Sequence, residues 1–295
     1  MEKFDFNGLG VAMITPFKED NSIDFESLDK IIDHLLIGGV DYIVVLGTTG
    51  ESATLTMEER KKVKEFVRKK TAGNVPLVLG YGGINTSELV RGLRTLDLDG
   101  FSAILSVAPF YVKPNQEGLY RHYREIAENS PLPVILYNVP GRTGCNLEAE
   151  TTLRLANDCP NIIAIKEASG RIEQIEEILA KKPTGFKVIS GDDSLACPLI
   201  FSGASGVISV FGNAYPKEFG DMVHDALEGR NKEAEEKHLR FLPIIKTLFE
   251  DGNPGGIKNL MALKGLCEEH LRLPLVAVGQ STATKIKKEK IELEK

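Results

Sequence analysis

The sequence predicts an α/β protein in which eight strand–helix units close into a (β/α)8 barrel, followed by a C-terminal helical appendix. Short runs rich in β-branched residues alternate with stretches of helical period. The runs recur at a spacing of roughly 25 to 30 residues, as strand–helix units of such a barrel do. The chain of 295 residues has room for the ~250 residues that this fold usually takes. A doubly wound open sheet is the alternative, but eight near-equal units favour closure.

The predicted strands are continuous apolar runs, which is typical of parallel strands that are buried on both faces. They fall at 10–14, 41–46, 75–79, 102–106, 133–137, 162–166, 186–190 and 206–210. Between them, apolar residues at helical spacing predict helices, for example over 25–35 and 147–155. Thr56 with Glu59 fits a capping box, and Asn85 or Thr86 can cap the helix that follows.

The pattern changes from about residue 225 onward. Two helices, 231–249 and 257–267, are predicted with no strand between them. We therefore expect two domains, the barrel over 1–224 and a helical domain over 225–295. The charged stretch 284–290 is expected to be a solvated helix or a frayed tail rather than a binding patch.

Composition excludes several classes of protein. The net charge of -6 and the pI near 5.6 argue against nucleic acid as a partner. No apolar stretch approaches the roughly 18 residues of a membrane span, and the N-terminus lacks a signal-peptide pattern. The four cysteines form no C-x-x-C pair and no H-E-x-x-H motif is present, so we expect no metal site. These features predict a soluble, reduced, cytoplasmic protein.

Lys166 is the most informative residue, because it ends a strand that is otherwise apolar. Burial there would disfavour the charge of the amine and leave it nucleophilic. On this segment alone, a lysine that snorkels from the strand end into water is the more common alternative. Tyr137 ends the preceding strand 29 residues earlier, one strand–helix unit away. Neighbouring parallel strands lie about 4.8 Å apart, so the phenol can approach the amine.

Other polar residues also follow the predicted strands, at the barrel end where chemistry occurs. In the segment 47–51, glycines and successive N–H groups can form an anion-binding nest, and the hydroxyls of Thr48 and Thr49 add donors. Such a segment is as often only a turn. Arg142 offers the planar fork that binds a carboxylate, although loop arginines are usually solvated. Tyr111, next to another aromatic residue, suggests contact with a substrate or a subunit.

Three segments, 47–51, 137–144 and 165–170, closely resemble the signature segments of the dihydrodipicolinate synthases. These enzymes belong to the pyruvate-dependent Schiff-base lyase family that also contains N-acetylneuraminate lyase. The resemblance covers nearly the whole chain and is weakest after about residue 250. It implies a (β/α)8 barrel with a C-terminal helical domain, assembled as a homotetramer that is a dimer of dimers.

The resemblance further implies condensation of pyruvate with L-aspartate 4-semialdehyde, in the diaminopimelate route of lysine biosynthesis. Lys166 would form the Schiff base with pyruvate. Thr48, Tyr137 and Tyr111 would relay protons, with Tyr111 contributed by a neighbouring subunit. No metal or organic cofactor would be needed, because the protonated imine is itself the electron sink.

Substrate-binding roles follow from the same resemblance. Thr49 would hold the pyruvate carboxylate, and Arg142 would bind the carboxylate of the semialdehyde at the entrance of the cavity. Gly191 and Ile208 would line the pyruvate pocket.

Two alternative functions remain open from the sequence. The nearer one is an aldolase of the same family that acts on N-acetylneuraminate or a 2-keto-3-deoxy sugar acid. Arg142 after a Pro-Gly pair argues against it, as does Thr48, where the sialic acid enzymes usually have serine. The distant one is an inactive barrel that serves as a binding module. That alternative predicts loss of some of Lys166, Tyr137, Thr48 and Tyr111, yet all four are present.

We predict weak or absent feedback inhibition by lysine. Lysine-inhibited members of the family carry hydrogen-bonding groups at positions that correspond here to Met57, Arg60, Ile84 and Phe110, although Glu88 is kept. Steady-state rates measured with micromolar lysine should therefore equal those measured without it. Inhibition in that concentration range would contradict the prediction.

Overall fold

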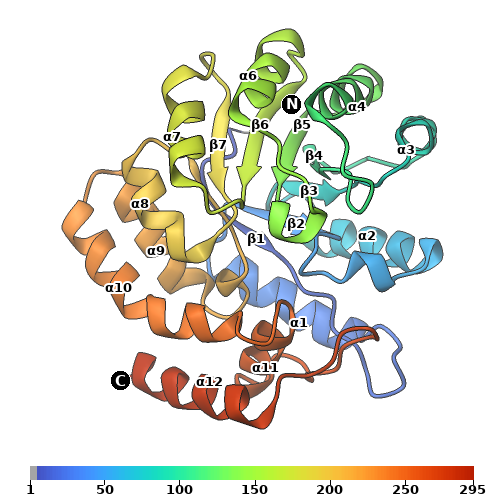
Figure 1. The fold of residues 1–295 in the computed structure, drawn as a ribbon. Coiled ribbons are helices and arrows are strands. Elements are labelled where there is room, and N and C mark those ends of the chain that lie inside the picture. Colours follow the sequence, from blue (N-terminus) through green and yellow to red (C-terminus); the bar gives the residue numbers. More distant parts are fainter. Residues whose placement is uncertain (1–4) are drawn as a thin grey trace.

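The computed structural model describes residues 5–295, and in them eight parallel strands close into a barrel (Figure 1). Each strand pairs with the next along the chain, and β8 pairs with β1. The strands are β1 Gly8–Ala12, β2 Tyr42–Val45, β3 Leu77–Gly80, β4 Ala103–Val107, β5 Val134–Asn138, β6 Ile162–Glu167, β7 Lys187–Ser190 and β8 Gly206–Ser209. Closure confirms the predicted barrel and excludes the open sheet.

Every predicted strand is present, with ends that differ by at most two residues. The largest difference is at β1, which was predicted to reach Ile14 but ends at Ala12. Ile14 is fully buried, yet its N–H donates to the side-chain oxygen of Asn213 at 3.1 Å instead of to a neighbouring strand. Apolar character therefore predicted burial correctly at this position but not membership of the sheet.

Two apolar layers lie on the two sides of the barrel wall, because side chains alternate along each strand. In β2, Tyr42 and Val44 belong to the inner cluster, whereas Ile43 and Val45 belong to the outer one. The outer cluster fills the space between strands and helices. The inner cluster is much smaller and consists mainly of Phe6, Ala12, Tyr42, Val44, Val78, Ala103, Leu105, Ile135, Tyr137, Val139, Ala164, Ile189 and Ile208.

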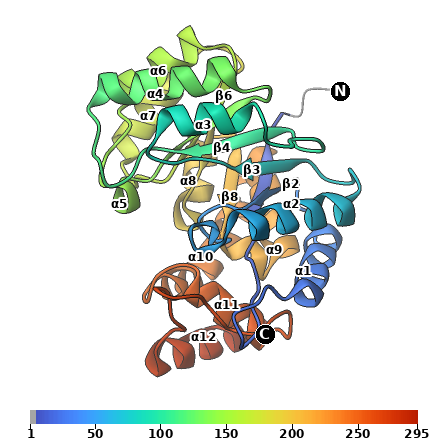
Figure 2. The ribbon, with the colours of Figure 1, turned by 90° about the vertical axis from the view of Figure 1, so that its right-hand side faces the viewer.

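Helices follow the strands and cover the outside of the barrel (Figures 1 and 2). They are α1 Phe25–Ile37, α2 Met57–Thr71, α3 Thr86–Leu93, α4 Gln116–Asn129, α5 Pro140–Thr143, α6 Ala149–Asp158, α7 Ile172–Lys181, α8 Ala196–Phe201 and α9 Pro216–Leu227. The capping box of Thr56 and Glu59 begins α2 as predicted, and of the two candidate caps for α3 it is Asn85 that is used. Within residues 5–295, no helix is long and apolar enough to cross a membrane.

The C-terminal helices pack together at one end of the molecule (Figure 1). They are α10 Asn231–Leu248, α11 Gly255–Leu263 and α12 Gln280–Leu293. The expectation of a solvated or frayed tail was wrong in part, because Ile286 of α12 is fully buried and α12 packs against α10 and α11. The division of the chain at 224/225 stays a prediction, and α9 runs across it.

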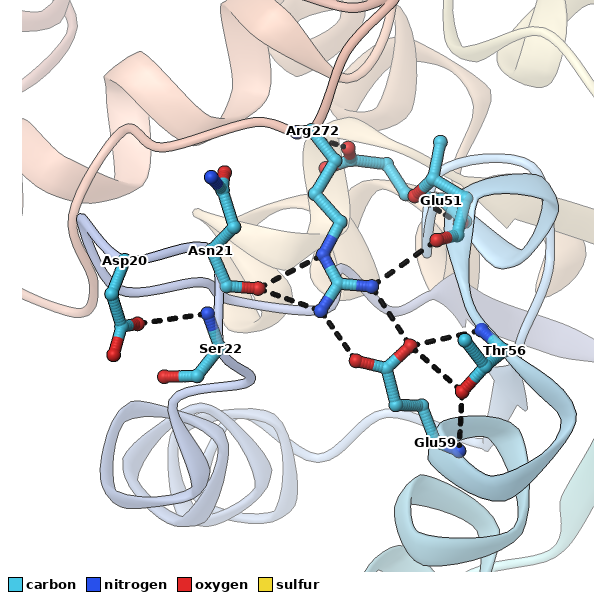
Figure 3. A network of polar contacts seen from close by, with 8 residues as sticks. Asp20, Asn21, Ser22, Glu51, Thr56, Glu59 and Arg272 are labelled. Carbon is cyan, nitrogen blue, oxygen red and sulfur yellow. Dashed lines mark hydrogen bonds and ion pairs between the residues drawn. The ribbon is translucent and has the colours of Figure 1, made fainter.

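Arg272, between α11 and α12, fastens the C-terminal segment to the barrel (Figure 3). Its guanidinium forms an ion pair of 2.5 Å with Glu59 of α2, and it donates to the main-chain oxygens of Thr54 at 3.1 Å and Asn21 at 3.0 Å. The hydrogen bond from Arg272 lowers the pKa of Glu59 to about 2. The segment therefore docks on the loops that follow β1 and β2 and on the first turn of α2.

Gly206→Ala should destabilise the protein strongly, because a Cβ at this position would lie 2.0 Å from the main-chain oxygen of Gly8. Its φ of +144° is also unfavourable for alanine. We expect a loss of at least about 2 kcal/mol, seen as a lower thermal midpoint.

Gly220→Ala is the matched control for this substitution. It lies inside α9, and its Cβ would meet Leu9 at an ordinary contact distance of 3.5 Å. We expect an unchanged or slightly higher midpoint, since alanine favours a helix by about 1 kcal/mol over glycine. Equal midpoints for the two variants would refute the steric account.

Candidate active site

Tyr137 and Lys166 face each other at the carboxyl ends of β5 and β6. The two residues are paired in the sheet, as their spacing predicted, and the Lys166 amine lies 4.4 Å from the centre of the Tyr137 ring. Both side chains are buried, with 7% and 5% of their surfaces exposed. The pair therefore lies inside the barrel, so the alternative of a lysine that extends into water does not hold.

A β-bulge at the start of β6 sets this pairing. Ile135 of β5 pairs with Ala164 rather than with Ile163, which is the extra residue of the bulge. Without it, Tyr137 would lie opposite Ile165, whose side chain faces the helices. A shift of one residue moves a side chain to the other face of a sheet. The bulge thus brings phenol and amine to the same face.

The residues that follow the pair point outward and form a buried polar network, which the sequence did not predict. Asn138 donates to both carboxylate oxygens of Glu167, at 3.0 and 3.2 Å. Gln174 and the N–H of Ser169 donate to the same carboxylate. Burial raises the pKa of Glu167. These bonds tie the ends of β5 and β6 together behind the two inward-facing side chains.

Gly191 lies against Lys166. A Cβ on Gly191 would come within 3.0 Å of Lys166 Cε and 2.6 Å of Ala168 Cβ. The N–H of Gly191 donates to the main-chain oxygen of Glu167 at 2.8 Å. The absence of a side chain at this position therefore leaves the space that Lys166 occupies.

Ile208 of β8 is almost fully buried in the inner apolar cluster. Asp193 fixes the loop after β7 to the end of β8, because its carboxylate accepts from the N–H groups of Val210 at 3.0 Å and Phe211 at 2.8 Å. Burial raises the pKa of Asp193 to about 6. The two predicted pocket residues thus belong to strand ends that are held together.

The loop after β2 carries Thr48 and Thr49. Thr48 is half-buried, whereas Thr49 is almost fully buried and its hydroxyl accepts a 3.0 Å hydrogen bond from the side-chain amide of Asn253. Thr15 donates to the main-chain oxygen of Gly50 at 2.7 Å and holds the loop toward β1. The sequence did not indicate Asn253, because nothing in its neighbourhood shows that it reaches a loop 204 residues away.

Glu51 ends this loop in a buried ion pair with Lys258 of α11. The oxygen–nitrogen distance is 2.5 Å, and neither side chain is exposed. Burial lowers the pKa of Lys258, and its amine also donates to the main-chain oxygen of His270 at 2.8 Å. Breaking a buried pair by removing one partner is costly, so the loop after β2 and α11 behave as one unit.

Arg142 and Tyr111 are more exposed than the other predicted residues. Arg142, in the short helix α5, donates to the main-chain oxygen of Asn253 at 3.2 Å. The side chain of Tyr111 is 86% exposed, and its N–H donates to the main-chain oxygen of Thr143 at 3.1 Å. Within residues 5–295, the fold therefore gathers the predicted residues at one barrel end but leaves the Tyr111 ring outside the inner pair.

The geometry suits formation of an imine. Among residues 5–295, no carboxylate and no hydrogen-bond acceptor pairs with the Lys166 amine, which lies over the Tyr137 ring. An amine held away from carboxylates and beside a phenol can attack a carbonyl carbon while the phenol moves protons.

Comparisons with known proteins agree with this arrangement. The chain matches the model of the dihydrodipicolinate synthetase family over residues 5–292. It is 51% identical over 295 residues to the 4-hydroxy-tetrahydrodipicolinate synthase of Porphyromonas gingivalis, covering 100% of this chain and 99% of the relative. The dihydrodipicolinate synthase structure from Aquifex aeolicus is similar with a TM-score of 0.93 and 40% identity, over 98% of this chain and 99% of that one. A structure described as the first monomeric dihydrodipicolinate synthase variant has a TM-score of 0.95 and 36% identity, over 98% and 97% of the two chains.

Gly191→Ala should slow attack of the Lys166 amine on a carbonyl compound, because the added methyl group forces the lysine or Ala168 to move. A displacement of this kind costs roughly tenfold to a hundredfold in rate. The rate of adduct formation can be measured by borohydride trapping and mass spectrometry. Gly83→Ala, whose Cβ would meet Leu89 at 3.5 Å, is the control and should react normally. A normal rate for Gly191→Ala would show that this glycine does not make room for the lysine.

Proposed function

The chain belongs to the dihydrodipicolinate synthetase family, and from this premise we propose that it has 4-hydroxy-tetrahydrodipicolinate synthase activity. It condenses pyruvate with L-aspartate 4-semialdehyde in the diaminopimelate route of lysine biosynthesis. The observation that carries the proposal is the buried pair of Tyr137 and Lys166, with an amine that no carboxylate neutralises among residues 5–295.

Lys166 is the nucleophile of the proposed mechanism. Its amine adds to the keto carbon of pyruvate, water leaves, and a protonated imine remains. Loss of a proton from the methyl group gives an enamine, which attacks the aldehyde carbon of the semialdehyde. The amino group of that substrate then displaces Lys166 and closes the ring. Tyr137, whose ring contacts the lysine amine, and Thr48 move the protons in these steps.

Two further residues bind the carboxylates of the substrates. Thr49 holds the carboxylate of pyruvate, and Arg142 binds that of the semialdehyde at the rim. Gly191 and Ile208 shape the pyruvate pocket between them. Both substrates are thereby held at one barrel end, and proximity of this kind contributes up to roughly 7 to 11 kcal/mol in well-oriented reactions.

Tyr111 completes the proton relay from a second copy of the chain, within a homotetramer that is a dimer of dimers. The exposure of three consecutive apolar side chains supports this proposal: Phe110, Tyr111 and Val112 are 44%, 86% and 54% exposed. Such patches mark contact surfaces. The cytoplasm is the proposed location, where the four cysteines, none of which forms a disulfide, stay reduced.

Borohydride reduction in the presence of pyruvate tests the proposal. We expect a stable mass adduct on the peptide that contains Lys166. Lys166→Ala should lose the adduct and at least about a thousandfold of kcat, or ~4 kcal/mol, while the barrel stays folded. Lys166→Arg keeps a positive charge without a nucleophilic amine and should be equally inactive.

Substrate choice is decided by a separate steady-state assay of condensation and cleavage. Wild-type protein should condense pyruvate with aspartate semialdehyde and leave N-acetylneuraminate and 2-keto-3-deoxy sugar acids uncleaved. Cleavage of such sugars without condensation would favour the aldolase. Absence of any adduct on the wild-type protein would refute both functions.

A further inference from the structure

Asn253, between α10 and α11, contacts two residues of the proposed site at once. Its side-chain amide nitrogen donates to the Thr49 hydroxyl at 3.0 Å, and its main-chain oxygen accepts from the Arg142 guanidinium at 3.2 Å. The residue is 8% exposed. Asn253 therefore lies between the groups proposed to bind the carboxylates of the two substrates.

The direction of the bond to Thr49 has a chemical consequence. A hydroxyl group has one proton to donate, and an amide NH2 group can only donate. Because the Thr49 oxygen accepts from Asn253, its own proton is left for another acceptor. No acceptor for that proton is present among residues 5–295. The Thr49 hydroxyl proton is thus available for donation to a ligand. A carboxylate, which only accepts hydrogen bonds, needs such a donor.

The C-terminal segment holds Asn253 firmly relative to the Thr49 loop. Five residues after Asn253, Lys258 forms the fully buried ion pair with Glu51, at the end of that loop. The main-chain N–H of Arg272 donates to the other oxygen of Glu51 at 3.3 Å (Figure 3). One buried ion pair and one main-chain hydrogen bond, both to Glu51, therefore fix the position from which the Asn253 amide donates.

We infer that Asn253 is a positioning residue for carboxylate recognition. Its side chain orients the Thr49 hydroxyl as a donor toward pyruvate, and its main-chain oxygen restrains Arg142 toward the second substrate. The inference rests on the proposed function, because it takes Thr49 and Arg142 as the groups that bind the two carboxylates.

Asn253→Asp and Asn253→Ala test the side-chain role. The aspartate has the same shape but only accepts, so it turns the Thr49 proton away from pyruvate and adds a like charge. We expect the KM for pyruvate to rise about tenfold with alanine and more with aspartate, since the Thr49 hydroxyl is then no longer held as a donor toward the carboxylate. At saturating pyruvate, kcat and borohydride trapping should remain near normal. Asn231→Asp, an exposed position in α10, is the matched control and should leave KM unchanged.

A double variant separates positioning from a general loss of structure. If Asn253 acts through Thr49, then Asn253→Ala added to Thr49→Val should raise the KM for pyruvate no further than Thr49→Val alone. Multiplied effects would overturn the inference. A KM within about twofold of wild type for both Asn253→Asp and Asn253→Ala would overturn it as well.

These outcomes are distinct from failure of the proposed function. Wild-type protein that forms no pyruvate adduct would refute the function. Wild-type protein that forms the adduct, with Asn253 variants that bind pyruvate normally, would refute only the role of Asn253. Asn253→Ala could lower the thermal midpoint. In that case Asn253→Asp, which preserves the shape of the side chain, decides whether Asn253 positions Thr49 or only supports the fold.

Discussion

The extra residue at Ile163 is the constraint on which the site depends. A parallel pair of strands offers each side chain one of two faces, and the bulge shifts β6 by one position so that Tyr137 and Lys166 share the inner face. The same shift puts Glu167 on the outer face beside Asn138, where their hydrogen bonds tie the two strands together. One local irregularity thereby determines both the reactive pair and its support.

Lys258 and Lys166, two of the lysines that are buried among residues 5–295, have opposite environments. Lys258 forms an ion pair with Glu51 and donates a hydrogen bond to the main-chain oxygen of His270. Its amine also lies over the ring of Phe17. Lys166 contacts an aromatic ring and, among residues 5–295, no carboxylate. A buried charge that is neutralised holds parts of a fold together, whereas one that is left alone is a candidate for chemistry. The contrast supports a structural role for the first lysine and a reactive role for the second.

Local patterns in the sequence predicted most of the fold and the buried pair of the candidate site, Tyr137 and Lys166. Continuous apolar runs predicted all eight strands, and a spacing of 29 residues placed Tyr137 beside Lys166. The bulge could not be predicted, because Ile162 to Ile165 are apolar on both faces and fit either register. Asn253 was missed since its partner is 204 residues away and the contact forms only when α11 docks. The apolar face of α12 was underestimated because charged residues surround Ile286.

Contact between residues so far apart also bears on how the protein is made. The last barrel strand ends at Ser209, so Asn253 and Lys258, the partners of Thr49 and Glu51, are added to the chain after every strand. Contacts between residues that are distant in the sequence form slowly, because the entropy of closing the chain between them is lost first. The Thr49 loop therefore reaches its final arrangement only once Asn253, Lys258 and Arg272, which all follow the last barrel strand in the sequence, have docked on it.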